Sequence, residues 1–96
     1  MSIVEITTFR LATGSEVPAF LAADKRVQTE LVPNRPGFVR RTTARRGAEW
    51  VVVTLWASDE AAAAGALASE GHPAWTEFTG HLEPGSLTTN RFETLD

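Results

Sequence analysis

The stretch EWVVVTLWAS, residues 49–58, decides the fold prediction because it is the most strand-like part of the chain. Its side chains alternate between two faces of the predicted strand, one carrying Val51, Val53 and Leu55 and the other Trp50, Val52 and Trp56. Both faces are apolar, whereas an antiparallel sheet that helices cover on one side normally has a polar second face. We therefore expect a homodimer whose sheets pack face to face. The alternative is a monomer in which some of these valines stay exposed.

Strand-like composition recurs in three other segments, residues 2–11, 37–44 and 86–95. The turn RRGA joins the second of these to residues 49–57 as a hairpin. If Ala44 lies opposite Glu49, Arg41 shares the face of Trp56, and Phe38 lies on the other face.

Three helices are predicted between these strands. Apolar residues at helical spacing indicate a helix that begins after the N-cap Ser15, runs to Leu31 and ends at VPNRPG. Ser58 caps a second helix over residues 59–70, and a short third helix follows over residues 73–82. The order β-α-β-β-α-β predicts a single α+β domain over residues 1–96, with the ferredoxin-like arrangement around an antiparallel sheet.

Composition excludes several classes of function. The chain has 96 residues, a net charge of −3 and no cysteine, so thiol nucleophiles and thiolate metal sites are absent from its sequence. The negative charge disfavours a nucleic-acid partner, and no apolar run is long enough to cross a membrane. The first residues lack the features of a secretory signal, so we expect a cytoplasmic protein. No His, Asp and Glu spacing resembles a metal site, and we predict none.

The helical segment HPAWTEF, residues 72–78, holds the side chains that suggest a site. Trp75 and Phe78 are three residues apart and share one face, where they can close one side of a cavity. His72 lies in an exposed turn beside them, and its ordinary pKa near 6.5 suits proton abstraction from a phenol. Arg41, on the predicted face of Trp56, can stabilise an anionic oxygen. The plainer alternatives are core packing for the aromatic residues, a capping role for His72 and a solvated basic hairpin.

Over nearly its whole length the chain resembles the antibiotic-biosynthesis-monooxygenase-like family, small proteins that form dimeric α+β barrels. The resemblance is carried by RPGFVRRTTAR leading into EWVVVTLWAS, then by the alanine-rich helix, HPAWTEF and the final strand. Characterised members insert oxygen without a metal or flavin, typically into polycyclic phenols, and a related branch degrades haem. The resemblance therefore implies the fold, the dimer and a reaction that needs no cofactor.

Site residues follow from the same resemblance. The Trp of the family's W-x-S pattern matches Trp56, which is expected to line a pocket between sheet and helices. The resemblance also matches His72, Trp75 and Phe78 to site residues of the family. With Phe20 of the first predicted helix added, the expected ligand contacts are Phe20, Trp56, Trp75 and Phe78; with Arg41 added from the hairpin register, the expected catalytic residues are His72, Trp56 and Arg41. The first strand carries Glu5 and two threonines where haem-degrading relatives have an asparagine, and the chain has no tyrosine.

Three hypotheses remain open at this point. The first is a cofactor-independent monooxygenase-like protein that acts on a small aromatic or phenolic molecule. The second is a protein that binds such a ligand in the same cavity without turnover. The third is a structural dimer in which the aromatic residues form only the core. A cavity beside Trp56 would distinguish the first two from the third.

Overall fold

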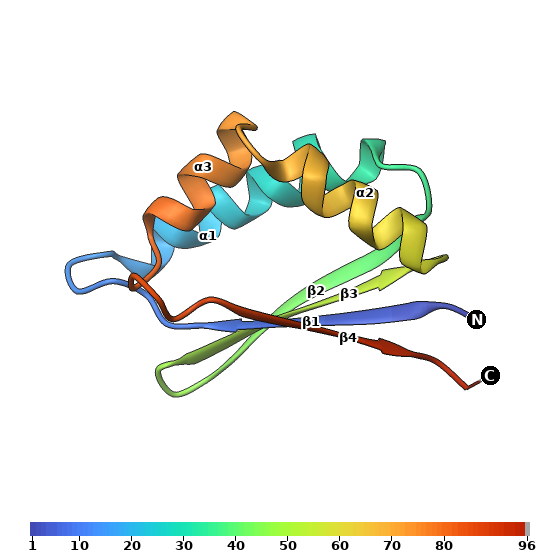
Figure 1. Ribbon diagram of the computed structural model, residues 1–96. Helices are drawn as coiled ribbons and strands as arrows, with labels where there is room; N and C mark the ends of the chain where they lie inside the picture. Colours follow the sequence, from blue (N-terminus) through green and yellow to red (C-terminus); the bar gives the residue numbers. More distant parts are fainter. Residues whose placement is uncertain (96) are drawn as a thin grey trace.

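The computed structural model describes residues 1–95 and has two layers, a four-stranded sheet and three helices on one of its faces (Figure 1). The strands are antiparallel and lie in the order β2-β3-β1-β4. In chain order the elements are β1 (Ile3–Phe9), α1 (Val17–Arg26), β2 (Phe38–Arg46), β3 (Glu49–Trp56), α2 (Asp59–Ser69), α3 (Pro73–Gly80) and β4 (Thr88–Glu93). This arrangement confirms the predicted α+β, ferredoxin-like fold.

In the hairpin of β2 and β3, the register of the pairing differs from the predicted register by two residues. Arg46, not Ala44, lies opposite Glu49, because Gly47 takes a positive φ of 59° and the loop needs only two residues. A shift of two residues keeps every side chain on its face. Arg41 therefore still lies on the face of Trp56, as predicted, although its partner is Thr54.

Phe38 lies on the opposite face from the one predicted. The register shifts between Phe38 and Arg40, so Val39 is an extra residue that bulges out of the strand. One extra residue reverses the alternation before it. Phe38 consequently faces the helices and packs edge-on against Trp56, with ring centroids 5.9 Å apart.

The first helix is capped differently from the prediction, and its last turns before VPNRPG are not α-helical. Its N-cap is Glu16, not Ser15, and no side chain caps it. Beyond Arg26 the helix widens into a π-helical turn, Val27–Leu31, and a short 3₁₀ turn, Val32–Asn34. The α-helical hydrogen-bond pattern cannot continue through Pro33, which has no N–H to donate. The other two helices begin where predicted. Ser58 Oγ accepts a hydrogen bond from the N–H of Ala61 at the start of α2, and α3 begins at Pro73.

The two tryptophans of β3 lie in separate parts of the core. Trp50 belongs to the main cluster beneath α1 and α3, where its ring centroid is 4.9 Å from that of Phe20. Trp56 belongs to a smaller cluster with Ile3 and Ala62. Both indoles are buried on the helix-covered face, so the predicted alternation of β3 is confirmed.

The sheet face away from the helices carries apolar side chains that the chain itself leaves uncovered. Val53 is 37% exposed and Phe92 is 56% exposed. The register places Ile6 opposite Val53, and Val4 opposite both Leu55 and Phe92, so these side chains share one face. The dimer that would cover this face stays a prediction. Within residues 1–95, no helix combines the length and apolar character that a membrane span requires.

Candidate active site

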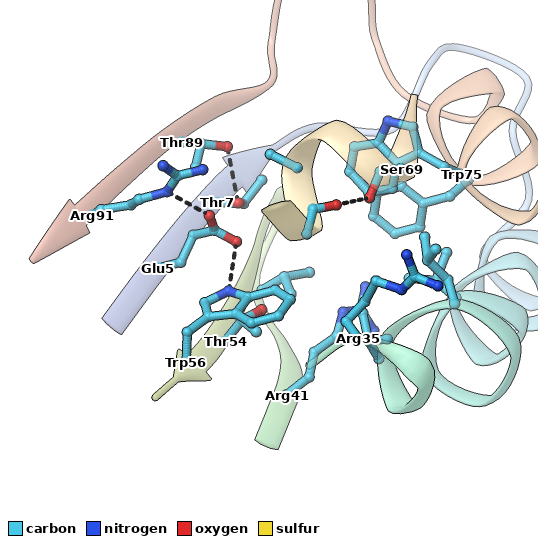
Figure 2. A pocket seen from close by; sticks show the side chains of 17 residues that line it. Glu5, Thr7, Arg35, Arg41, Thr54, Trp56, Ser69, Trp75, Thr89 and Arg91 are labelled. Atoms are coloured by element: carbon cyan, nitrogen blue, oxygen red, sulfur yellow. Dashed lines mark hydrogen bonds and ion pairs between the residues drawn. The ribbon is translucent and has the colours of Figure 1, made fainter. Parts of the chain in front are cut away.

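A cavity of about 240 Å³ lies between the sheet and the helix layer, beside Trp56 (Figure 2). Its apolar lining comes largely from the segment after α1, from β3 and from α3, and includes Val27, Leu31, Val32, Val52, Trp56, Trp75 and Phe78. Its polar lining includes Glu5, Thr7, Thr54, Thr89 and the arginines Arg35, Arg41 and Arg91. An apolar cavity with a few convergent polar groups is the usual form of a small-molecule site.

The carboxylate of Glu5 joins three strands at one side of the cavity. Oε1 accepts a hydrogen bond from Trp56 Nε1 at 3.3 Å, and Oε2 accepts one from Arg91 Nε at 2.9 Å. Arg91 also donates to the carbonyl of Ala62 in α2, at 3.4 Å. The Glu5 side chain is 16% exposed, and a carboxylate has about four lone-pair sites. Glu5 therefore orients the Trp56 indole and can still accept a hydrogen bond from a ligand.

Two threonines continue the polar side of the cavity along β1 and β4. Thr7 and Thr89 are register partners, and their hydroxyl oxygens are 3.0 Å apart and hydrogen-bonded. Figure 2 shows these side chains beside Glu5 and Arg91, across the cavity from Trp75 and Arg35. One side of the cavity is thus polar and supplied by β1 and the edge strand β4.

Arg41 fixes β2 to the first helix. Its Nη2 donates to Asp24 Oδ1 at 2.7 Å, its Nη1 donates to Gln28 Oε1 at 3.3 Å, and its guanidinium carbon lies 5.7 Å from the centre of the Phe78 ring. The Arg41 side chain is 4% exposed and that of Asp24 is 13% exposed. Buried charges are tolerated when they are paired and hydrogen-bonded in this way. Arg41 lines the cavity, but its contacts are mainly those of a structural ion pair.

Trp75 and Phe78 form the aromatic wall that their spacing predicts. Both line the cavity, and their rings stack with centroids 5.1 Å apart and an interplanar angle of 14°. Together with Trp56 they present aromatic surface from two layers of the fold. Planar apolar ligands are favoured by such surfaces because they bury area and stack on the rings.

Two of the predicted site residues lie elsewhere. His72 is the N-cap of α3, where its Nδ1 accepts a hydrogen bond from the N–H of Ala74 at 3.1 Å, and it does not line the cavity. Phe20 is fully buried in the main core against Phe9 and Trp50, also outside the cavity lining. The structure thus brings Trp56, Arg41, Trp75 and Phe78 together and leaves His72 and Phe20 out.

Sequence reasoning did not identify Glu5, Arg91 or Arg35 as site residues. Glu5 lies on the same face of β1 as the core residues Ile3 and Phe9, and a charged residue on a covered face is a signal that could have pointed to it. Arg91 becomes its partner only through the pairing of β1 with β4. Arg35 lies in VPNRPG, which served only to end the first helix.

An exposed charge network joins the helices that cover the cavity. Arg26 on α1 contacts Glu30, with Nε 3.0 Å from Oε2, and also Glu77 on α3. The hydrogen bonds that Arg26 donates to these carboxylates raise the pKa of Arg26, and the hydrogen bond from the guanidinium lowers the pKa of Glu30. The contribution of Glu30 to stability is therefore present above its usual pKa near 4.3 and is lost as the pH falls below it. Within residues 1–95 there is no group of three His, Asp or Glu side chains that could hold a metal ion.

No protein-family model and no curated protein matches this chain in sequence. Solved structures match it over nearly its whole length. SnoaB, a cofactor-independent oxygenase from Streptomyces nogalater, is 16% identical with a TM-score of 0.75, over 99% of this chain and 94% of its own. A candidate antibiotic biosynthesis monooxygenase from Bordetella bronchiseptica is 12% identical with a TM-score of 0.81, over 98% of this chain and 97% of its own.

The chain has the fold of the antibiotic biosynthesis monooxygenases. Rv0793 from Mycobacterium tuberculosis shares it as well, at 17% identity and a TM-score of 0.74, over 100% of this chain and 97% of its own. The resemblance to this family that the sequence indicates is confirmed at the level of the fold. At such identities the chemistry has to be argued from the residues of this chain.

Proposed function

We propose that this protein is a cofactor-independent monooxygenase that oxidises a small phenolic or other aromatic molecule in the cavity beside Trp56. One observation carries the proposal: a carboxylate and aromatic side chains line the same cavity. Glu5 accepts a hydrogen bond from the Trp56 indole, and Trp75 and Phe78 also line the cavity. SnoaB, a cofactor-independent oxygenase that shares this fold, supports the reaction class. A purely structural dimer would need no such cavity.

The size of the cavity sets the size of the substrate. At about 240 Å³ it lies below the roughly 300–1,000 Å³ of pockets for drug-sized ligands, which favours a molecule of two or three fused rings. Trp75, held against the buried ring of Phe78, supplies the stacking surface, and Glu5 lies where a polar ring substituent can reach it. The substrate would bind with its ring plane against the aromatic wall and its hydroxyl toward β1.

In this reaction dioxygen is the oxidant and the activated substrate is the reductant. Glu5 accepts a proton from the substrate, and the resulting carbanion, stabilised by the phenolic ring, transfers electrons to dioxygen and forms a carbon–oxygen bond. The hydroperoxide takes the proton back, loses the second hydrogen from the same carbon and releases water. A ring CH₂ thereby becomes C=O, with one oxygen atom in the product and the other in water.

We also propose that the protein is a homodimer that buries the uncovered sheet face. Val53 and Phe92 lie on that face with other apolar side chains of β1 and β3, and monomers rarely leave such a surface exposed. A two-fold partner presents the same residues and closes the two sheets into a barrel. Such an interface is expected to bury roughly 1,200–2,000 Å² or more.

Oxygen uptake in the presence of an anthrone tests the proposed reaction. The wild-type protein is expected to consume about one dioxygen per anthrone above the rate of spontaneous oxidation. Glu5→Gln, which keeps the hydrogen bond to Trp56 but removes the basic oxygen, is expected to lower this rate by about 10²-fold or more. Arg46→Gln, in an exposed hairpin position, is the matched control. Binding without uptake would make the protein a binder, and uptake that survives Glu5→Gln would remove Glu5 from the mechanism.

A further inference from the structure

Among residues 1–95, Arg35 is the cavity arginine whose side chain has no hydrogen-bond or ion-pair partner. It lines the cavity, its Nε is buried without a hydrogen-bond acceptor, and it takes part in no ion pair among residues 1–95. The other buried side-chain polar atom without a partner in this range, Thr43 Oγ1, is not on the cavity lining. Buried polar groups are nearly always satisfied, so an unsatisfied one at a cavity requires an explanation.

The other two cavity arginines are compensated within the chain. Arg91 is paired with Glu5 at 2.9 Å, and Arg41 is paired with Asp24 at 2.7 Å. Since these carboxylates are already engaged, the part of the chain that the structure describes leaves one positive charge of the cavity lining uncompensated, that of Arg35. A guanidinium stays charged at every physiological pH, so Arg35 cannot avoid this charge by losing a proton.

The backbone holds Arg35 in place. Its N–H donates to the carbonyl of Val32 at 3.0 Å, and its own carbonyl accepts from the N–H of Phe38 at 3.2 Å. Pro33 and Pro36 flank it and restrict the chain on both sides. The loop between the first helix and β2 therefore presents the arginine from a fixed position and loses little further entropy when a ligand binds.

We propose that Arg35 binds a carboxylate group of the ligand, so that the cavity selects an aromatic acid over its neutral analogue. The proposal rests on the proposed function only in requiring that the cavity binds a small aromatic molecule. A carboxylate matches the planar donor fork of a guanidinium and supplies the missing negative charge. The neighbouring lining, with Leu31, Val32 and Trp75, is apolar and strengthens a charged hydrogen bond relative to water.

Binding of 2-naphthoate and of neutral 2-naphthamide, measured by calorimetry at pH 7, tests this inference. The two probes have nearly the same shape and differ in charge. The wild-type protein is expected to bind the acid about tenfold or more tightly than the amide. Arg35→Gln is expected to remove that preference while leaving the affinity for the amide within about twofold, which also shows that the cavity is still folded. Arg35→Lys, which keeps the positive charge but loses the planar pair of guanidinium donors, should retain part of the preference for the acid.

Arg46→Gln removes the same charge at an exposed position outside the cavity and should keep the full preference. Equal wild-type affinities for acid and amide, or a preference that persists in Arg35→Gln, would overturn the assignment of Arg35. If the wild-type protein bound neither probe, both this inference and the proposed aromatic site would fail. A charge preference without oxygen uptake would instead keep the inference and overturn only the oxygenase reaction.

Discussion

Gly65 of α2 lies directly against the indole of Trp56. A β-carbon at this position would be 2.8 Å from Cζ2 of the indole and closer still to Cη2, so no side chain fits there without moving the ring. Glycine is unfavourable inside a helix, and its place in an alanine-rich helix has no local reason. The contact supplies the reason, because the absence of a side chain at Gly65 leaves room for the residue that borders the cavity.

Gly65→Ala is therefore expected to destabilise the protein. Helix propensity alone would give a gain of about 1 kcal/mol, whereas overlap with a buried ring costs about 1–3 kcal/mol. Urea unfolding measures the difference. The control is Ala63→Gly, an exposed position of the same helix, which should cost about 1 kcal/mol from propensity alone. A clear gain in stability for Gly65→Ala would show that Trp56 does not occupy this position in solution.

The ion pair of Arg41 and Asp24 predicts a non-additive effect on stability. Asp24→Leu leaves the Arg41 guanidinium, which is 4% exposed, without its carboxylate and is expected to cost about 3 kcal/mol. The double variant Asp24→Leu with Arg41→Leu removes both charges and should cost less than the single change. Denaturant unfolding of the two single variants and the double variant gives the coupling energy. Simple additivity would contradict the structural role assigned to this pair.

Substitution of His72 is expected to lower the stability of the protein without changing its turnover. Its Nδ1 caps α3 through the N–H of Ala74, so His72→Ala should cost about 1 kcal/mol, and His72→Asn, with a side-chain acceptor, should restore most of it. Oxygen uptake per folded protein should be the same in all three proteins. Loss of uptake in both variants would instead support the role of proton acceptor that the sequence suggests for His72.

The proposed dimer can be tested on its uncovered sheet face. Light scattering at micromolar concentration is expected to give twice the monomer mass for the wild-type protein and the monomer mass for Val53→Arg, which places a charge within the apolar face. Leu67→Arg is the matched control, since Leu67 is 69% exposed on the helix side of the molecule. A monomeric wild-type protein, or an equal effect of both substitutions, would contradict the proposed interface.

Features that depend on neighbouring residues could be predicted from the sequence. The alternation of β3 placed Trp50, Val52 and Trp56 correctly beneath the helices, and Ser58 was recognised as a helix cap. Such features follow from local periodicity and from the chemistry of helix ends. The arrangement of the elements then followed from their order along the chain.

Features that depend on distant contacts could not be predicted in the same way. The partners Glu5 and Arg91 are 86 residues apart and meet only because β4 pairs with β1. The bulge at Val39 places Phe38 on the opposite face from the one predicted, and no local sequence pattern predicts this bulge. That Arg35 has no ion-pair partner within residues 1–95 becomes visible only once the carboxylates near the other arginines are placed. Site chemistry in this chain is therefore a product of tertiary structure.

The most direct test of the central claim, that the cavity beside Trp56 binds a small aromatic molecule, follows the three indole N–H signals in a ¹H–¹⁵N NMR titration with 2-naphthoate. Trp56 and Trp75 line the cavity, whereas Trp50 is buried against Phe9 and Phe20 and serves as an internal control. We predict saturable shifts of the Trp56 and Trp75 signals with the Trp50 signal unchanged. Shifts confined to Trp50, or no saturable shift at any of the three, would contradict the account.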